Sequence, residues 1–431
     1  MHNHEADNLT EPTWGADPLE YLGGFRTLRY DPDALFRSSL PANGTARWNT
    51  TEAIQSTASS SSANVSLSIS HSNVDWDFLK VVYGWAAVQY QSWARGELTV
   101  RGNSTQTIIL YTDAILEFWV GDAHYFGGDF FTFRKAPPVL HLVPGTHRID
   151  IRLARDVRAF GGILAPTIDV LLHAEQASST LELAKPGILM SDVVDRKLAS
   201  RIGSVVLRNS GRDSIKIVGI QPLDVRHPLS LRQPVSLQEL NTQNILAQDS
   251  RALTTEQKDP SSPQNELDVV IAAGQTRPVA FDISLPTRNV SSIQYVIAYK
   301  GVRSNSISIL QASQNLTQRS IYEPHKITYL HPGGMASYAM LRPPAKNATC
   351  GPGQKSSLPV LLDLHGAGNE ADNGVVAHAL DPVPDLCAFV MFPTGVTPWS
   401  GDDWRECVVQ ERIDELMHQQ IIGDLQMSKL R

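Results

Sequence analysis

The residues best placed to do chemistry lie in one short stretch, "LPVLLDLHGAG", which runs from Leu358 to Gly368. Its apolar run stops abruptly at His365-Gly366-Ala367-Gly368. A short apolar run followed by small residues is typical of a buried parallel strand that leads into a tight loop. The backbone N–H groups of such a loop can stabilise negative charge that develops on an oxygen during acyl transfer. This loop is therefore the first candidate for a catalytic element.

Two other nucleophile candidates have a histidine nearby in the sequence: Ser337 follows His331, and Cys407 precedes His418. A serine or cysteine without a strained turn or a positioned base is almost always chemically inert. We therefore assign neither pair a catalytic role.

Metal-binding candidates are equally sparse. Asp402 and Asp403 are adjacent, but two carboxylates in a loop are more often solvated or cap a helix. His2 and His4 lie near the start of the chain and offer adventitious binding only. We predict no metal site and no cofactor.

Length and composition limit the classes of protein that fit. The 431 residues suggest about two to four domains, and 42% hydrophobic with 19% charged residues is typical of a globular protein. The net charge is −7 and no basic run occurs, which argues against a nucleic-acid partner. No stretch approaches the roughly 20 apolar residues of a membrane helix, so we expect no membrane partner.

The apolar patterns divide the chain into five parts. Residues 1–62 are predicted to form an extended arm that ends in a flexible Ser-rich connector, "TEAIQSTASSSSAN". Closely spaced strand patterns then predict a β-sandwich over 63–175 and a second, immunoglobulin- or fibronectin-like sandwich over 176–312. In 313–404, a hairpin precedes two apolar strands separated by a helical pattern, which indicates a parallel sheet. Residues 405–431 form a divergent tail with helical spacing.

The first sandwich resembles PA14-like modules through "LYTDAILEFWVGDAHYFGG". Some such modules bind sugars through calcium held by two adjacent aspartates, whereas this chain has Thr112-Asp113 there. We therefore expect no calcium. Its aromatic residues are predicted to pack in the core and on the surface rather than to form a sugar platform: Trp85, Trp93, Phe118, Trp119, Tyr125 and Phe130.

Residues 337–404 resemble the opening of the catalytic domain of fungal secreted α/β-hydrolases related to prolyl-oligopeptidase-like peptidases and esterases. The resemblance is carried by "SYAMLRPPAKNATC", "LPVLLDLHGAGNEADN" and "HALDPVPDLCAFVMFPTGVTPWSGDDW". The upstream pair of sandwiches resembles the layout of that group as well. The resemblance implies that His365-Gly366-Ala367-Gly368 forms an oxyanion hole, with the N–H of Ala367 as donor. The expected fold is therefore multidomain and mainly β: two β-sandwiches followed by an incomplete α/β-hydrolase domain.

The chain departs from that group after Trp404, because the Gly-x-Ser-x-Gly elbow that carries the nucleophile occurs nowhere in it. We therefore expect a truncated serine-hydrolase relative, inactive as written, whose Ser, acid and His lie beyond the end of the chain. The alternative is a secreted binding or scaffold module that recognises sugar or cell wall through the sandwiches. The expected ligands are accordingly an ester, a peptide or a glycan.

N-glycosylation sequons are over-represented. Eight of the 17 Asn residues lie in Asn-x-Ser/Thr, namely Asn8, Asn43, Asn49, Asn64, Asn103, Asn289, Asn315 and Asn347. Because Ser and Thr make up about a seventh of the chain, chance would give roughly two or three. The excess predicts a secreted glycoprotein, although the chain as written opens without an apolar signal segment.

Two further expectations concern the C-terminal part. Cys350 and Cys387 each precede a predicted strand, and the starts of neighbouring parallel strands lie close together, so we predict that they form a disulfide and leave Cys407 free. The strand over 360–364 would lack one neighbour, and an unpaired apolar edge favours self-association.

Overall fold

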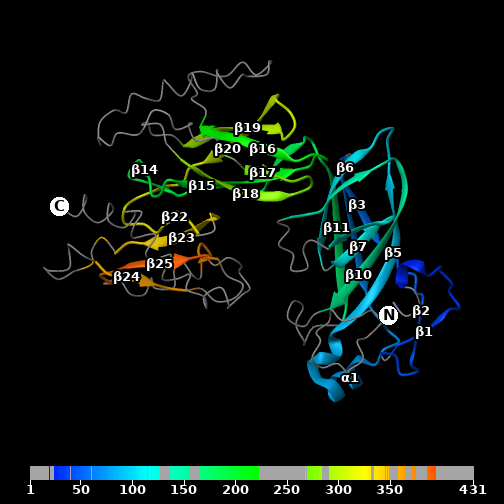
Figure 1. Cartoon of the computed structure of the whole chain (residues 1–431). Helices are drawn as coiled ribbons and strands as arrows, with labels where there is room; N and C mark the ends of the chain where they lie inside the picture. Colours follow the sequence, from blue (N-terminus) through cyan, green and yellow to red (C-terminus); the bar gives the residue numbers. More distant parts are fainter. Residues whose placement is uncertain are drawn as a thin grey trace. The chain divides into compact units, whose positions relative to one another are not determined.

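The computed structural model describes residues 19, 24–38, 40–59, 61–113, 115–126, 136–155, 166–222, 267, 269–283, 291–331, 334–344, 346, 348, 358–364, 370–374 and 386–394. The protein is mainly β, as the sequence predicted (Figure 1). It divides into two compact units. The first comprises residues 1–182, 210–212 and 274–276, and the second comprises residues 183–209, 213–273 and 277–431.

The first unit contains a sandwich of two antiparallel sheets. One sheet has the order β5 (Tyr90–Val100), β10 (Gly145–Arg155), β7 (Ile115–Val120) and β8 (Ala123–Phe126). The other has the order β3 (Ile54–Ser59), β4 (Ser62–Ile69), β11 (Ile168–Gln176), β6 (Gln106–Asp113) and β9 (Val139–Leu142). Alternate residues of both sheets point inward into one shared core, which includes Phe118, Leu153, Leu140 and Ile168.

The Ser-rich segment corrects our prediction of a flexible connector. Residues 54–59 form strand β3, which pairs with β4, and β4 pairs in turn with β11. Serine and threonine give no apolar alternation to read, but their backbones pair as well as any others at the edge of a sheet. The first sandwich therefore begins before residue 63.

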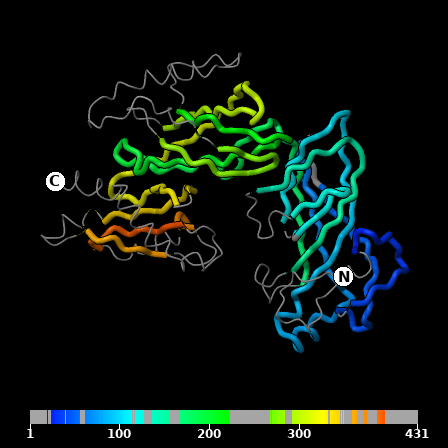
Figure 2. The backbone as a smooth tube through the Cα atoms, in the orientation of Figure 1, coloured from blue at the N-terminus to red at the C-terminus, as the bar shows by residue number. Residues whose placement is uncertain are grey.

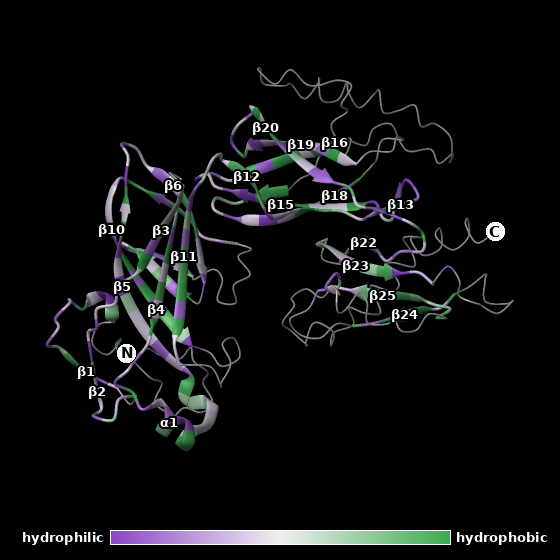
Figure 3. Cartoon of the chain, turned by 180° about the vertical axis from the view of Figure 1, so that it is seen from behind, coloured by the Kyte–Doolittle hydropathy of each residue, from purple (hydrophilic) through white to green (hydrophobic). Residues whose placement is uncertain are grey.

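One short helix, α1 (Trp76–Tyr83), interrupts the strands of the first unit. It begins because the Asp75 carboxylate accepts the N–H of Phe78 at 3.0 Å, and it ends at Gly84, whose φ of 62° favours glycine. The 3-10 helix η3 (Gly84–Val88) follows directly. Figure 3 shows α1 to be rich in apolar residues, and several of them are exposed: Phe78, Val81, Val82, Tyr83 and, in η3, Trp85.

The N-terminal arm docks on the outer face of the β5–β10–β7–β8 sheet. It contains η2 (Phe25–Thr27) and the two-stranded sheet of β1 (Leu35–Arg37) and β2 (Thr45–Arg47), drawn in blue in Figure 2. Phe25 is buried and stacks on Trp93, with ring centroids 5.0 Å apart. The guanidinium of Arg95 lies 4.9 Å from the Phe25 ring and donates to the Leu28 carbonyl at 2.6 Å.

Beneath the arm, a buried carboxylate holds three arginines. Asp150 on β10 is 0% exposed, and its oxygens lie 2.6 Å from Arg95 Nε, 3.0 Å from Arg148 Nε and 3.7 Å from Arg26 Nε. Arg26 comes from the arm, so this cluster joins η2 to the sheet. Burying a carboxylate is tolerable only when cations and hydrogen bonds compensate its lost hydration.

The second unit contains a second β-sandwich. One sheet has the order β12 (Leu181–Leu189), β15 (Ile202–Asn209) and β18 (Thr276–Asp282). The other has the order β17 (Val269–Ile271), β16 (Ile215–Pro222), β19 (Ser292–Gly301) and β20 (Ile307–Asn315). Phe281 of the first sheet meets Tyr295 of the second edge to face, at 5.3 Å between centroids. Our predicted boundary at residue 312 falls inside β20, so this sandwich extends slightly further.

Gly203 explains how closely β15 packs in this sandwich. A methyl group added at its Cα would lie 2.6 Å from Ile283 Cδ1 and 2.9 Å from Phe281 Cζ. A Cβ at this position would therefore displace two core side chains.

A third sheet of the second unit has the order β22 (His325–Leu330), β23 (Ala336–Arg342), β25 (Phe389–Pro393) and β24 (Val360–Leu362). β22 and β23 form the predicted antiparallel hairpin, β23 and β25 are antiparallel, and β24 and β25 are parallel, as predicted. β25 is buried along its whole length because apolar side chains cover both of its faces.

A fourth, smaller sheet connects this region to the sandwich. It consists of β14 (Lys197–Leu198), β13 (Val193–Val194) and β21 (Gln318–Arg319). Next to it, the Asp192 carboxylate accepts the N–H of Lys326 at 2.9 Å, while the Asp192 N–H donates to the Lys326 carbonyl at 3.0 Å. The second sandwich and the β22–β23–β25–β24 sheet thus share backbone hydrogen bonds within one compact unit.

Candidate functional site

The candidate oxyanion loop follows β24 at the carboxyl end of the strand. The four residues His365, Gly366, Ala367 and Gly368 lie outside the described residues, so their predicted role stays a prediction. The strand itself is described as far as Leu364, and the N–H of Asp363 extends its pairing by donating to the Met391 carbonyl at 3.0 Å. The parallel sheet therefore positions the first end of this loop.

The segment that follows the loop, residues 370–374, is held by a polar network on the hairpin. The Tyr338 hydroxyl donates to Asp372 Oδ1 at 2.9 Å and lies 3.2 Å from Glu370 Oε2. Lys326 Nζ pairs with Asp372 Oδ2 at 2.9 Å and lies 4.2 Å from the centroid of the Tyr338 ring. The same lysine thus contacts a carboxylate and an aromatic face.

The ionisation states reinforce this network. Burial, together with the neighbouring Asp372 and Glu370 charges, raises the pKa of Tyr338 well above its ordinary value, so the hydroxyl keeps its proton. Burial would raise the pKa of Asp372, but the hydrogen bond and charge of Lys326 outweigh it and hold that pKa below its usual value. The neutral Tyr338 hydroxyl therefore lies between the carboxylates of Glu370 and Asp372, and Asp372 is also paired with the cationic Lys326.

The backbone on the far side of the loop is fixed as well. Ala371 is 0% exposed, and its N–H donates to Thr394 Oγ1 at 3.3 Å. The N–H of Thr394, which directly follows β25, donates to the Tyr338 carbonyl at 3.0 Å. Both described flanks of residues 365–369 are therefore anchored to the same sheet, as a loop with preorganised N–H donors requires.

Sequence reasoning missed the residues of this network. Lys326 and Tyr338 lie in strands that are recognised by their apolar residues, and nothing in the local sequence indicates that both side chains contact Asp372. Glu370 and Asp372 fall in the segment between the two apolar strands, where the sequence predicts a helix, and most of that segment lies outside the described residues.

The rejected nucleophile and metal candidates gain no support. The Ser337 hydroxyl donates to the Thr394 carbonyl at 3.5 Å rather than to a base. Within the described ranges, no three His, Cys, Asp or Glu side chains gather as metal ligands would. Cys407, His418, Asp402, Asp403, His2 and His4 all lie outside those ranges.

Cys387, immediately upstream of β25, is disulfide-bonded. Its partner is not among the described residues, which contain neither Cys350 nor Cys407. The pairing of Cys387 with Cys350 therefore stays a prediction.

Five of the eight sequon asparagines lie in the described residues, and four of these five are exposed. Asn43, Asn49, Asn103 and Asn315 are exposed, whereas Asn64 is partly buried in β4 with its amide oxygen 2.5 Å from His173 Nδ1. The other three, Asn8, Asn289 and Asn347, lie outside the described residues. Among the helices that the structure describes, none has the length and hydropathy needed to cross a bilayer.

Comparisons with known proteins name no function for the chain. No family model matches it, so neither the PA14-like nor the hydrolase resemblance is shown. Weak similarity links it to an exo-chitosanase of Amycolatopsis orientalis (TM-score 0.27, 12% identity, 59% of this chain and 28% of that one). A β-glucuronidase of Bacteroides uniformis is similarly distant (TM-score 0.25, 10% identity, 77% of this chain and 40% of that one). Similarity at this level supports no statement about fold or function.

One relative is much closer in sequence. An uncharacterized secreted protein of Arthroderma benhamiae is 40% identical over 399 residues, which are 92% of this chain. The chain spans only 38% of the length of that relative.

Proposed function

We propose that this chain is the N-terminal part of a secreted serine hydrolase, in which two β-sandwiches precede the first strands of an α/β-hydrolase domain. The proposal is carried by the β22–β23–β25–β24 order. In an α/β-hydrolase sheet, the strand that ends in His-Gly lies between the "CAFVMF" strand and the strand that leads to the nucleophile. β24 pairs with β25, which contains "FVMF", and has its other side at the end of the described sheet.

The mechanism assigned to this region is electrostatic. The N–H of Ala367 would donate to the oxyanion that forms when a serine attacks an ester or peptide carbonyl. Tyr338, Asp372 and Lys326 would act as positioning residues, because they hold the segment that follows the loop. The nucleophile, its base and the acid would come from sequence like that of the longer relative, since this chain contains no Gly-x-Ser-x-Gly.

The full-length Arthroderma relative provides a test of the loop's role. Proline at the position aligned with Ala367 removes the N–H donor and should lower kcat on activated esters by about 10²–10³, the usual cost of one oxyanion donor. Glycine at the same position retains the N–H and serves as the matched control. Equal activity of the two variants would refute the assigned donor. We expect the present chain to show no turnover of the same esters.

Secretion belongs to the proposal as well. It is supported by the sequon excess, by the exposure of Asn43, Asn49, Asn103 and Asn315, and by the secreted relative. Protein from the native host should lose mass when N-glycans are removed enzymatically, and peptide mapping should place glycans on those four residues. A protein of unmodified mass would contradict secretion through the glycosylating pathway.

A binding or scaffold function of the sandwiches is compatible with the proposal, because a sandwich can hold a ligand while a separate domain does chemistry.

Self-association through β24 likewise stays a prediction. Leu361 in β24 is 45% exposed and Leu364, two residues after the strand, is 39% exposed, so apolar side chains face solvent here.

A further inference from the structure

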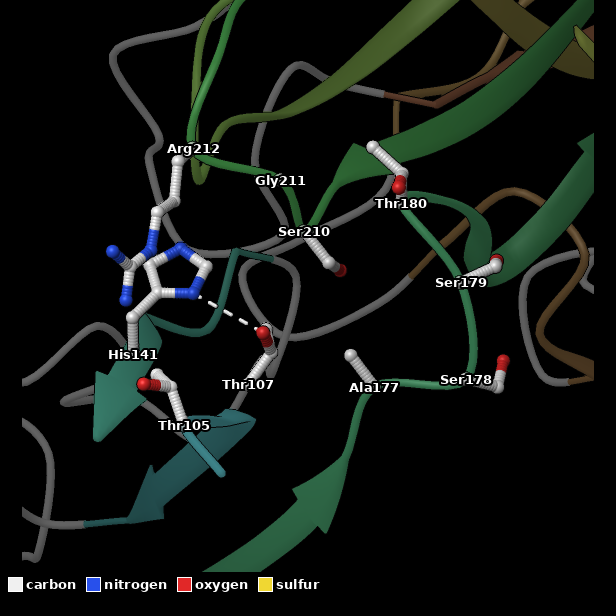
Figure 4. A pocket seen from close by; sticks show the side chains of 10 residues that line it. All are labelled: Thr105, Thr107, His141, Ala177, Ser178, Ser179, Thr180, Ser210, Gly211 and Arg212. Carbon is white, nitrogen blue, oxygen red and sulfur yellow. Dashed lines mark hydrogen bonds between the residues drawn. The ribbon is translucent and has the colours of Figure 1, made fainter. Parts of the chain in front are cut away.

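We propose that a pocket in the first unit binds a neutral saccharide. The pocket has a volume of about 550 Å³, within the range of small-molecule sites. All ten residues that line it belong to the same compact unit. They are Thr105, Thr107, His141, Ala177, Ser178, Ser179, Thr180, Ser210, Gly211 and Arg212 (Figure 4).

Six of the lining side chains carry a hydroxyl group. The hydroxyl protons of the three serines among them are donated in hydrogen bonds within the protein. Ser178 donates to Glu182 Oε1 at 3.1 Å, and Ser210 donates to Glu182 Oε2 at 3.3 Å. Ser179 donates to the Leu181 carbonyl at 2.7 Å. A hydroxyl whose proton is engaged still offers lone pairs, so these oxygens are poised to accept hydrogen bonds. A ligand rich in O–H groups complements such a lining.

The histidine of the pocket is held in place and stays neutral. His141 Nδ1 is hydrogen-bonded to the Thr107 hydroxyl at 3.1 Å, the dashed line in Figure 4. Burial and, secondarily, the charge of Arg212 lower the pKa of His141, although a hydrogen bond to the Gly211 backbone opposes them. At neutral pH the ring therefore contributes hydrogen bonding without charge.

The two charged groups that the structure describes at the pocket, Arg212 and Glu182, have opposite signs. Arg212 is exposed, makes no ion pair within the described part of the chain, and brings five N–H donors to the rim. Glu182, directly behind Ser178 and Ser210, supplies one negative charge. A phosphate or polyanion would meet this carboxylate, whereas an uncharged polyol meets acceptors from the hydroxyls and donors from Arg212. This balance selects a neutral saccharide as the ligand class.

The pocket also adjoins a predicted glycan. Thr105 is the third residue of the Asn103 sequon, and Asn103 is exposed. A glycan on Asn103 would compete with a soluble ligand, so binding should be measured on the secreted chain after enzymatic removal of N-glycans.

The experiment is calorimetric titration of the whole chain with cellotriose, chitotriose, laminaritriose and maltotriose, and with digalacturonate as the acidic comparison. We expect at least one neutral trisaccharide to bind with a Kd on the order of 1 mM or below, detectable at about 10 mM ligand. Arg212→Ala and Thr180→Val should each weaken that binding by about fivefold or more, the value of one hydrogen bond. Arg303→Ala, an exposed arginine in the second unit, is the matched control and should bind as the wild type does.

Three results would overturn the proposal. They are no binding of any neutral trisaccharide at that concentration, binding that survives both pocket variants, and a clear preference for digalacturonate. Thermal unfolding of each variant shows whether the fold is intact, and within the described residues neither the Arg212 nor the Thr180 side chain makes a hydrogen bond or ion pair whose loss should destabilise it. None of these outcomes depends on the proposed hydrolase activity.

Discussion

Ser200 and Thr328 are 128 residues apart in the chain, yet their side-chain oxygens lie 2.6 Å apart in a buried hydrogen bond. The Ser200 oxygen also accepts the backbone N–H of Thr328 at 2.6 Å, and the Thr328 hydroxyl donates to the Ile202 carbonyl. Thr328 lies in β22 and Ser200 lies just before β15. This pair therefore joins the candidate hydrolase sheet to the second sandwich.

Replacing Thr328 with valine keeps the shape of the side chain but removes its hydroxyl. The buried Ile202 carbonyl and the Ser200 hydroxyl then lose a partner, so we expect a loss of about 1–3 kcal/mol in the free energy of unfolding. Denaturant unfolding would measure it, with Thr328→Ser as the control that keeps the hydroxyl. Equal stability of the valine and serine variants would show that the pair contributes nothing.

A second prediction concerns the arginine cluster beneath the arm. Asp150→Asn leaves Arg26, Arg95 and Arg148 without their shared buried carboxylate, so the variant should lose about 3 kcal/mol of stability. Asp122→Asn is the matched control, because Asp122 pairs with the same Arg26 at 3.1 Å but is fully exposed. The control should be indistinguishable from the wild type in thermal unfolding. If both variants unfold alike, the buried carboxylate is not what holds the arm.

The partly buried His71 allows a prediction of how stability depends on pH. Burial lowers the pKa of His71 to about 4, and its Nε2 has no hydrogen-bond partner in the described structure. Between the unfolded pKa of about 6.5 and the folded value, the unfolded state binds the extra proton, so stability falls as the pH drops through this window.

His71→Phe retains the aromatic ring beside Tyr90, 5.4 Å away, and removes this titration. The variant should gain stability relative to the wild type at pH 5, and the gain should vanish near pH 8. Unfolding curves at both pH values measure it. If the difference in stability between the variant and the wild type is the same at pH 5 and pH 8, the pH dependence does not come from His71.

The disulfide of Cys387 gives a covalent prediction. Non-reducing peptide mapping should link Cys387 to Cys350 and find Cys407 as a free thiol. The loop so closed has 38 residues, and in the chain-entropy model closing it contributes on the order of 3–4 kcal/mol. A Cys387–Cys407 peptide would overturn the predicted pairing.

Much of the fold could be predicted from strand patterns in the sequence. The parallel pair of 360–362 and 389–393 follows from two short apolar runs, and the hairpin over 325–342 follows from two strand patterns separated by a Pro-Gly-Gly segment. The 54–59 strand could not be read in this way. Serine and threonine give its sequence no apolar alternation, and the strand is recognised only from its backbone pairing with β4.

Sites that are assembled from distant segments of the chain could not be predicted from the sequence. Asp150 looks like the polar position of an alternating strand, and only the folded arm brings Arg26 to it. Likewise, Lys326 and Tyr338 reach Asp372 because β22 and β23 are paired in that register. The pocket collects its hydroxyls from three separate segments, and no local motif marks them as parts of one binding site.

Fluorophosphonate labelling tests the central claim, that the β22–β23–β25–β24 sheet opens a serine-hydrolase domain. The probe should be applied to the full-length Arthroderma benhamiae relative and to this chain in parallel. We predict stoichiometric labelling of the relative at a serine within Gly-x-Ser-x-Gly, C-terminal to the region aligned with this chain, and no labelling of the chain itself. An unlabelled relative, or stoichiometric labelling of a serine within this chain, would contradict the account.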